Sequence, residues 1–551
     1  MSISEQKTKS KSAVGLFFSG VFVLTLANVL VKAVGLISKI ILNRVVGSVG
    51  AGYYSSAYEI YAYLYVISTS GLPVALSIMI SKCRAKGKYK EAKRIYDLAL
   101  ALFLVIGITF SLLMIAFADK IALMIGARET RLCIVAIAPT MLFICISSCL
   151  RGYFQGFQLM HPTAISQIIE AISKVAVGVM LALFAKSKGY PDYVVAACTV
   201  FGVTLGVFLG MIYLYVKKLK FNEEKYFFCV SEENNEDKKA LIKELFKIAV
   251  PITLSSSVLS LTTVIDTLMV QNRLLAYGMN DLSIKIYYGD YTSLVISMFN
   301  LPTILFYPIV NALVPLISAT KEKGDEAKNE AIRCQSLRIV TLISVPCAVG
   351  LGFFSYPILD LLMFKSDSVK RASPWLSIVA VSVIFLGIIA TTNAFLNTSG
   401  KQKLPVISMG VGALGKLLSN YLLLGKIGIW GAPISTVICY ILAAALNVLF
   451  VVKYVGKLPP INKIFTVPIF NAIFSIGLSA VIYLGLTHVI AAKLATVIAI
   501  FIAVLLYALL SLKFKVITED DILMLPKGNK ILKLLYKYNI ITRNRTKCIK
   551  K

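Results

Sequence analysis

Histidine, paired cysteines and enzyme motifs are scarce or missing in this sequence. Its two histidines, His161 and His488, are too few for a catalytic or metal-binding histidine cluster. The ten cysteines are scattered without a CxxC pair, which indicates neither a zinc site nor a disulfide framework. No P-loop, HExxH or GxSxG motif occurs in a supporting context. We therefore expect a protein that is not an enzyme, does not hydrolyse ATP and carries no cofactor.

Charged residues are scarce as well, at 15% of 551 residues against about 25% in soluble proteins. The apolar residues are grouped into segments of about 20 residues, the length that crosses a ~30 Å hydrocarbon core. The predicted fold class is therefore an all-α integral membrane protein of the plasma membrane. Hydropathy places fourteen transmembrane helices near residues 14–42, 52–81, 95–118, 132–150, 162–186, 192–216, 242–271, 291–319, 334–355, 373–397, 404–424, 430–452, 465–488 and 493–512.

Basic residues outnumber acidic ones by 57 to 27, which gives a net charge of +30. The basic clusters fall in alternate loops, at 82–94, 217–220, 321–323, 401–403 and from 527 onward. This alternation follows the positive-inside rule, so we expect both termini in the cytoplasm and anionic membrane lipids as partners. The first apolar segment has no cleavage site after it and is expected to remain as a span. No aromatic–basic module predicts nucleic-acid binding.

The two halves of the sequence repeat one another. "NR" at 43–44 recurs at 272–273, and "GLP" at 71–73 recurs as "NLP" at 300–302, each 229 positions later. Two lobes of six spans each are typical of alternating-access transporters with a site between the halves. The predicted parts are an N-terminal lobe 1–216, a cytoplasmic linker 217–241, a C-terminal lobe 242–457, two further spans within 458–515 and a basic cytoplasmic tail 516–551.

Corresponding spans are also broken at corresponding places. Gly71 and Pro73 interrupt the second span, and Pro302 and Pro308 interrupt the eighth. Such breaks are tolerated where neighbouring groups or a water-filled cavity satisfy the freed backbone. They are candidate hinges, with ordinary kinks as the equally weighted alternative.

A polar stripe runs along the first predicted span. Its members step by four, three, four and four residues and so share one helix face: Asn28, Lys32, Gly35, Lys39 and Asn43. Lys32 lies about 6 Å from the membrane midplane, where a charge costs roughly 2.5–3.5 kcal/mol. Lys39 lies about 16 Å away and can reach the interface, as can the anchor Arg44. Lys32 therefore predicts a wet cavity or a buried partner, and a cationic cavity favours an anionic substrate such as a phosphate-bearing amphiphile.

Few other charges lie within predicted spans. Asp266 lies in the seventh span, while Lys416 and Asn420 lie four residues apart in the eleventh. A lone intramembrane Asp is a candidate proton or cation site, and an ion pair between Asp266 and Lys416 is the equally weighted alternative. In the fifth span, we expect Glu170 and Lys174 to compensate each other at i, i+4 spacing.

Several stretches resemble a known family over roughly residues 14–515. The most specific is "RGYFQG" at 151–156 followed by "PTAISQ" at 162–167, and "STSGLPVALSIMISK" at 68–82 and "NLPTILFYPIVNALVPLIS" at 300–318 agree with it. The chain is similar to the polysaccharide transporter branch of the multidrug/oligosaccharidyl-lipid/polysaccharide (MOP) exporter superfamily. Within that branch it resembles the stage V sporulation protein B group and the MurJ-type lipid II flippases.

The resemblance implies a V-shaped fold of two lobes around a cationic cavity. It also implies that undecaprenyl-pyrophosphate-linked peptidoglycan precursor (lipid II) is moved from the inner to the outer leaflet. The family's first-span cations match Lys32 and, with a one-residue ambiguity against Ser38, Lys39. The regions that match further cavity arginines, 65–69 and 295–299, contain none, so lysines or other positions would have to serve. The expected substrate-binding residues are Lys32, Lys39, Asn28, Asn43, Ser38 and Arg44.

The resemblance also implies candidates for ion coupling. Some relatives bind sodium through an acidic group in the seventh span and polar groups in spans eleven and twelve, a pattern that Asp266 and Asn420 fit. Lys416 stands where a second oxygen ligand is expected, so its ammonium could replace the ion. Energy would come from Na⁺ or H⁺ coupling or from the membrane potential.

Three alternative functions stay open. The chain could export another lipid-linked oligosaccharide, for a capsule or a sporulation-specific wall, or act as a cation-coupled multidrug exporter. A drug exporter predicts acidic groups in the cavity, whereas this sequence supplies mostly basic ones. A scaffold for cell-wall synthesis would leave the polar stripe unexplained. We expect a monomer, with cell-wall synthesis proteins as further partners.

Overall fold

The computed structural model describes residues 3–221, 238–307, 309–310, 317, 326–363, 366–456, 458 and 462–514. Every regular element within these ranges is a helix, and none is a strand. Nine of the described helices are long and apolar enough to cross a membrane, or ten if the bent pair Asp367–Ala380 and Ser382–Thr398 forms one span. The described residues therefore form an all-α, multi-pass membrane protein. The number of fourteen spans and the V shape stay predictions.

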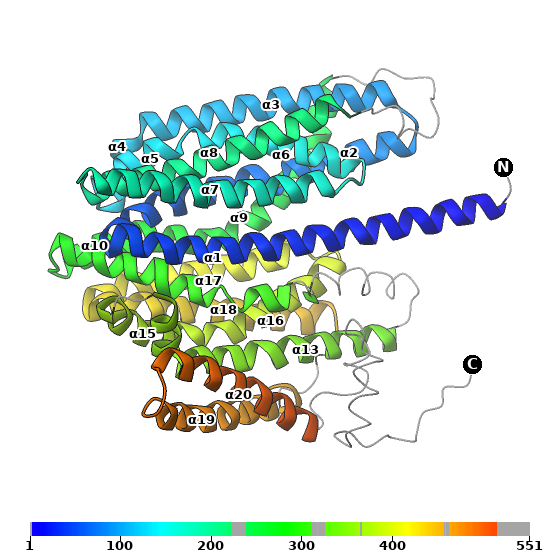
Figure 1. Ribbon diagram of the computed structural model, residues 1–551. Coiled ribbons are helices and arrows are strands. Elements are labelled where there is room, and N and C mark those ends of the chain that lie inside the picture. The colour runs from blue at the N-terminus through cyan, green and yellow to red at the C-terminus, as the bar shows by residue number, and fades with distance from the viewer. Residues whose placement is uncertain are drawn as a thin grey trace. The chain divides into compact units, whose positions relative to one another are not determined.

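The chain divides into two compact units, and the first comprises Met1–Ser297 and Ala413–Ser435. This division is distinct from the predicted lobes 1–216 and 242–457, which stay a prediction. The helices of the first unit are α1 (Ile3–Ser70), α2 (Leu72–Ala85), α3 (Tyr89–Ala116), α4 (Ala118–Ile125), α5 (Thr130–Ile137), α6 (Thr140–Gly156), α7 (His161–Ser187), α8 (Asp192–Leu219), α9 (Lys238–Ala276), α10 (Asp281–Asp290) and the π-helix Tyr291–Val295. Helices α3, α6, α7 and α8 lie side by side within it (Figure 1).

Glycine allows the closest helix contacts in this unit. A Cβ atom on Gly202 of α8 would lie 2.4 Å from the Cα atom of Gly178 on α7. A Cβ atom on Gly289 of α10 would lie 2.0 Å from the carbonyl oxygen of Ser48 on α1, and one on Gly52 would lie 2.8 Å from the carbonyl oxygen of Lys285. No side chain fits at such distances, so these positions let backbones touch.

The first predicted span and the first part of the second lie in two helices that meet at a kink and together form α1. Gly47 has a φ of 75°, a left-handed value that favours glycine, and it separates the two predicted spans within α1. The helix then stops at Gly71, and Pro73 lies in the first turn of α2, where its missing N–H removes no helical hydrogen bond. A Cβ atom on Gly71 would lie 2.2 Å from the carbonyl oxygen of Ala249 on α9. The predicted break at Gly71 is present, and its use as a hinge stays a prediction.

The eighth predicted span begins irregularly. The π-helix Tyr291–Val295 leads into α11 (Ile296–Phe299), and the chain turns before buried Pro302. A π-helix inserts an extra residue into the helical ladder and is frequent at functional sites. Pro308, the other candidate hinge, lies outside the described residues.

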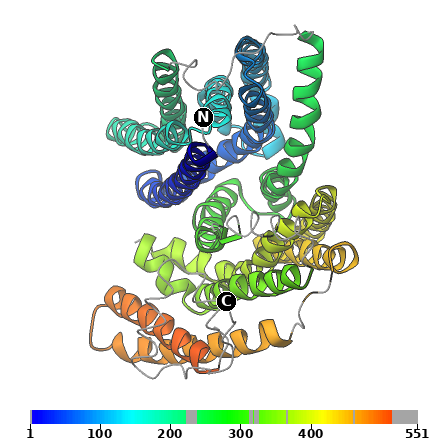
Figure 2. The same cartoon turned by 90° about the vertical axis from the view of Figure 1, so that its right-hand side faces the viewer.

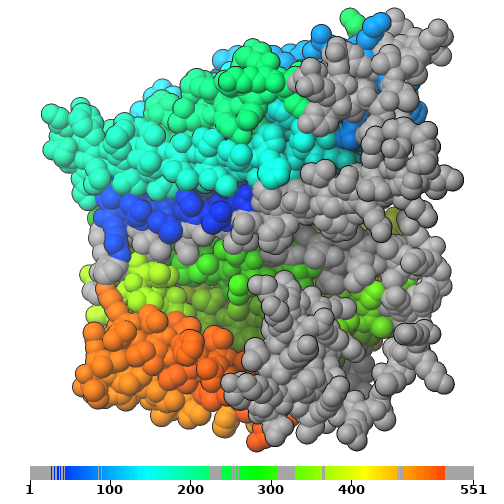
Figure 3. Space-filling view, turned by 45° about the vertical axis from the view of Figure 1, so that its right-hand side comes forward, coloured from blue at the N-terminus to red at the C-terminus, as the bar shows by residue number. Residues whose placement is uncertain are grey.

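The second unit comprises Met298–Gly412 and Thr436–Lys551. Its helices are α13 (Glu326–Phe353), α14 (Ser355–Met363), α15 (Ser366–Ala380), α16 (Ser382–Thr398), the first part of α17 (Lys403–Ile427), most of α18 (Gly431–Tyr454), the π-helix Asn462–Thr466, α19 (Val467–Leu486) and α20 (Ala492–Lys513). α19 and α20 lie side by side (Figure 2). They form part of the surface in Figure 3, and their exposed residues include Phe470, Val481 and Phe501, as expected for helices that face lipid.

Candidate functional site

The predicted polar stripe lies on α1, but most of its side chains are outside the described part of the chain. This holds for Asn28, Lys32, Lys39 and Asn43. Of its neighbours, Ser38 is half-buried and Arg44 is exposed. A Cβ atom on Gly35, a member of the stripe, would meet no atom of the described residues within 4 Å. The substrate-binding roles of these residues stay predictions.

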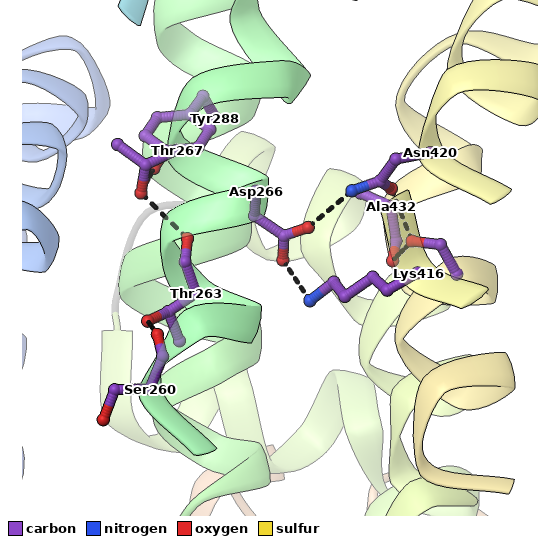
Figure 4. A network of polar contacts seen from close by, with 9 residues as sticks. Ser260, Thr263, Asp266, Thr267, Tyr288, Lys416, Asn420 and Ala432 are labelled. Carbon is purple, nitrogen blue, oxygen red and sulfur yellow. Dashed lines mark hydrogen bonds and ion pairs between the residues drawn. The ribbon is translucent and has the colours of Figure 1, made fainter. Parts of the chain in front are cut away.

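A buried polar network joins α9 to α17 within the first unit (Figure 4). The Lys416 ammonium lies 2.7 Å from Oδ2 of Asp266, and the Nδ2 amide of Asn420 donates to Oδ1 of the same carboxylate at 2.9 Å. The side chains of Lys416 and Asp266 are only 4% and 7% exposed. Of the two alternatives raised by the sequence, the structure shows the ion pair.

The fourth member of this network was not predicted. The Ser435 hydroxyl on α18 donates to Oδ1 of Asn420, 2.5 Å away, and lies 2.9 Å from the carbonyl oxygen of Ala432. Ser435 and Asn420 are both fully buried. Because Ser435 uses the amide oxygen, the Asn420 amide is held with its N–H groups toward Asp266. A serine in a predicted span gives little signal, since a serine hydroxyl can also bond to its own helix backbone.

Threonine hydroxyls continue the polar contacts along α9. The Tyr288 hydroxyl donates to Oγ1 of Thr267, which donates to the carbonyl oxygen of Thr263, and Thr263 donates to that of Ser260 (Figure 4). The Gln271 amide also donates to the Ser56 hydroxyl of α1 at 2.9 Å. These bonds fix the part of α9 that carries Asp266 against α1 and α10.

The residues around Asp266 do not fit the sodium site that the resemblance implies. A sodium ion requires oxygen atoms directed at one point, as hard cations do in general. Here each carboxylate oxygen of Asp266 faces a nitrogen donor, from Lys416 on one side and Asn420 on the other. Among the described residues, no group of three or more His, Cys, Asp or Glu could hold a metal ion.

A second charged cluster, which the sequence did not indicate, lies around Lys285 of α10. Its ammonium contacts Oδ2 of Asp281 at 2.6 Å and Oε2 of Glu129 at 3.0 Å, and lies 5.2 Å from the centre of the Tyr53 ring. Burial alone lowers the pKa of Lys285, but hydrogen bonds to Asp281, Tyr53 and Glu129 outweigh it, so the pKa is raised. Lys285 ties α10 to α1 and to the residue before α5. Glu129 lies 156 positions away, beyond any local spacing rule.

The expected pairing of Glu170 with Lys174 is replaced by a different ion pair. Arg151 of α6 lies 2.9 Å from Oε2 of Glu170, and its Nε donates to the Ser166 hydroxyl at 3.1 Å. The Lys174 ammonium instead lies 5.7 Å from the centre of the Tyr58 ring. A buried arginine on a facing helix is a stronger partner than a neighbour at i, i+4 spacing, because its planar guanidinium also satisfies Ser166. Arg151 and Ser166 both belong to the specific motif stretch, "RGYFQG" and "PTAISQ".

Comparisons with known proteins agree with this architecture. The polysaccharide biosynthesis protein family matches residues 17–321, and the MatE family matches residues 251–422. Stage V sporulation protein B of Bacillus subtilis (strain 168) is 27% identical over 446 residues, which is 79% of this chain and 84% of that protein. Lipid II flippase MurJ of the same organism is 26% identical over 459 residues, or 79% of this chain and 82% of that protein.

A solved structure also shares the fold. The lipid II flippase MurJ in an inward closed conformation superposes with a TM-score of 0.68 at 16% identity, covering 90% of this chain and 98% of the other. A multidrug resistance MATE family transporter in an inward-facing conformation gives a TM-score of 0.62 at 14% identity. With more than half of its residues matched, the chain belongs to the polysaccharide biosynthesis protein family, in the polysaccharide and lipid II flippase branch of the MOP superfamily of membrane transporters.

Proposed function

We propose that this protein is a flippase for a lipid-linked oligosaccharide that carries a pyrophosphate, with lipid II as the first substrate to test. Two relatives that match most of the chain support this proposal, because one is named a lipid II flippase and the other a sporulation protein. Transport would proceed by alternating access without ATP hydrolysis, with both termini in the cytoplasm and the chain acting as a monomer.

One observation carries the choice of an anionic substrate. The two described carboxylates that the sequence placed in the fifth and seventh spans, Glu170 and Asp266, are each paired with a cation, Arg151 or Lys416. Neither offers the unpaired acidic group that would attract a cationic drug. The lysines of the α1 stripe, Lys32 and Lys39, have no acidic residue at the neighbouring stripe positions. A cavity lined by these two lysines would attract a pyrophosphate, and the ion pairs of Glu170 and Asp266 make those two carboxylates poor sites for a cationic drug.

In the proposed cycle, Lys32 and Lys39 contact the pyrophosphate while the polyprenyl tail stays in lipid. Asn28, Ser38 and Asn43 would add hydrogen bonds, and Arg44 would attract the headgroup at the membrane interface. Gly71, Pro73, Pro302 and Pro308 would absorb the backbone changes between the two states. Anionic lipids around the basic loops, and cell-wall synthesis proteins that supply or consume the precursor, are the proposed partners.

The test is leaflet-resolved accessibility of lipid II in a strain depleted of its own flippase. We expect the wild-type chain to restore outer-leaflet lipid II, and the pair Lys32→Ala with Lys39→Ala to restore little of it. Lys188→Ala is the matched control, because Lys188 is an exposed lysine at the end of α7. If the Lys32→Ala, Lys39→Ala double variant flips lipid II as well as wild type at equal protein level, the two lysines do not bind the substrate. Failure of the wild-type chain, with restored export of another saccharide, would reassign the substrate.

A further inference from the structure

We propose that Lys416 is a built-in counter-ion that takes the place of a soluble monovalent cation at Asp266, so that this site works without sodium. The inference concerns the network between α9 and α17 and does not depend on which substrate is moved. Lys416 decides whether Asp266 is neutralised by a fixed ammonium or by a soluble cation, which is a property beyond the proposed function.

Charge balance favours a fixed cation beside Asp266. The Asp266 side chain is 7% exposed, and an ionised carboxylate at such a depth requires a compensating positive charge. The Lys416 ammonium supplies that charge at 2.7 Å and is itself 4% exposed, so each group compensates the other. An additional metal ion here would bring a second positive charge beside the ammonium, and the described contacts of Asp266 and Lys416 include no second carboxylate that would offset it.

The hydrogen bonds around Asp266 also run in the direction that suits an anion. A cation site would present the oxygen of Asn420 and the oxygen of Ser435 toward the ion. In this structure Asn420 presents its N–H to Oδ1 of Asp266, while its own oxygen accepts from Ser435. Ser435 and Asn420 therefore form a series of donors that ends on Oδ1 of Asp266, while Lys416 donates to Oδ2. That arrangement suits an anion with a fixed partner and is the reverse of a metal-binding arrangement.

The Lys416 ammonium is covalently part of the chain, unlike a soluble ion. A soluble ion binds Asp266 to an extent that depends on its concentration, whereas the ammonium of Lys416 is always present beside it. Lys416 belongs to α17 and Asp266 to α9, so the bridge between these helices has the same strength at every sodium concentration. Any change of conformation that separates α9 from α17 must separate this ion pair, rather than wait for an ion to leave.

Removing the lysine side-chain charge should uncover a cation site in the same place. Lys416→Met would leave Asp266 Oδ2 without its ammonium, while Oδ1 stays beside the Asn420 amide, which Ser435 supports from behind. A half-turn of the Asn420 amide would direct its oxygen toward Asp266 as well. Oxygen atoms of this kind are the ligands of hard cations. A cation that binds the folded state only would stabilise the variant by mass action.

The experiment is thermal unfolding of the purified protein in NaCl and in choline chloride at equal ionic strength. We expect wild type and Lys416→Arg to unfold at the same temperature in both salts. Lys416→Met should unfold at a lower temperature than wild type in choline and recover several degrees in NaCl. The pair Asp266→Asn with Lys416→Met lacks both charges and should show no response to sodium. Binding of radioactive sodium to the same four proteins gives a second readout that requires neither transport nor substrate.

Two outcomes would overturn the proposal. The first is a wild-type protein that binds sodium or is stabilised by it relative to choline, in a manner lost in Asp266→Asn. The second is a Lys416→Met variant as stable as wild type in choline, since Asp266 would then need no counter-ion. If Lys416→Met unfolds in both salts while the double variant folds, the counter-ion role holds and the uncovered cation site is wrong. If the wild-type protein does not respond to sodium and also does not flip lipid II, the proposed function is contradicted. The counter-ion role of Lys416 is not contradicted by that result.

Discussion

Two lysines of the first unit, Lys416 and Lys285, both bind carboxylates on other helices or loops, yet their surroundings differ. Lys416 has one carboxylate, on Asp266, and both side chains are almost completely buried. Lys285 is 8% exposed, but its two carboxylates, on Glu129 and Asp281, are 41% and 61% exposed. Water can replace a lost partner in the second cluster and not in the first. The free energy lost on breaking each cluster should therefore differ severalfold, although the distances are alike.

Breaking the buried pair from the carboxylate side should have the largest effect. Asp266→Asn leaves the Lys416 ammonium buried without a counter-charge, which we expect to cost about 3–5 kcal/mol of unfolding free energy. Adding Lys416→Met removes the orphaned charge and should recover much of that loss. Denaturant or thermal unfolding of the purified single and double variants measures this. A single variant as stable as wild type would contradict the buried character of the pair.

Weakening the same network without changing its charge should have an intermediate effect. Asn420→Ala removes an N–H donor from an ionised carboxylate, a loss of about 1.5–3 kcal/mol, while the Ser435 hydroxyl keeps the Ala432 carbonyl as an acceptor. Ser419→Ala is the matched control, because the Ser419 hydroxyl donates to the Gly415 carbonyl of its own helix one turn earlier. Equal unfolding temperatures for these two variants would show that Asn420 contributes nothing beyond helix packing.

The charged cluster around Lys285, whose two carboxylates are partly exposed, should lose less stability on mutation than the buried pair. Lys285→Met removes both ion pairs, but Glu129 and Asp281 can then turn to water, so we expect a loss of about 1 kcal/mol. Arg131→Met, which breaks a more exposed pair with Asp119 near the same loop, is the control and should cost less. Denaturant or thermal unfolding of the purified Lys285→Met and Arg131→Met variants measures these two losses. A loss from Lys285→Met as large as that from Asp266→Asn would abolish the distinction between the two clusters.

The smallest expected effect is a pH dependence at Lys285. Its pKa is raised above the ordinary value of 10.5 in the folded state, so its charge contributes stability that is fully present below pH 10.5. That contribution is lost as pH rises through the folded-state pKa. The difference in unfolding temperature between wild type and Lys285→Met should therefore shrink above pH 10.5 and stay constant from neutral pH up to that point. A difference that grows with alkaline pH would contradict the sign of the shift.

The all-helical membrane class and the break at Gly71 were predictable because they depend on local properties. Runs of apolar residues fix the class, and a glycine next to a proline fixes the end of a helix. The pairing of Asp266 with Lys416 could be proposed as well, since two opposite charges in apolar spans must find partners. The sequence could not choose between that pair and an ion, because the choice depends on the distance between helices.

Contacts that join distant parts of the chain were not predictable. Glu170 had a lysine four residues away, and only the packing of α6 on α7 shows that Arg151 is its partner. The series from Ser435 through Asn420 to Asp266 requires three helices to meet at one point. The Gly52 and Gly289 contact likewise follows from the approach of α1 to α10, which no spacing within either segment specifies.

The most direct test of the proposed function uses the purified protein in liposomes that contain fluorescent lipid II in one leaflet. We predict protein-dependent transfer of lipid II to the other leaflet that is equally fast in NaCl and in choline chloride. The double variant Lys32→Ala with Lys39→Ala should show little transfer above empty liposomes. Absence of protein-dependent lipid II transfer by the wild-type chain, at a density at which it is folded, would contradict the proposed function.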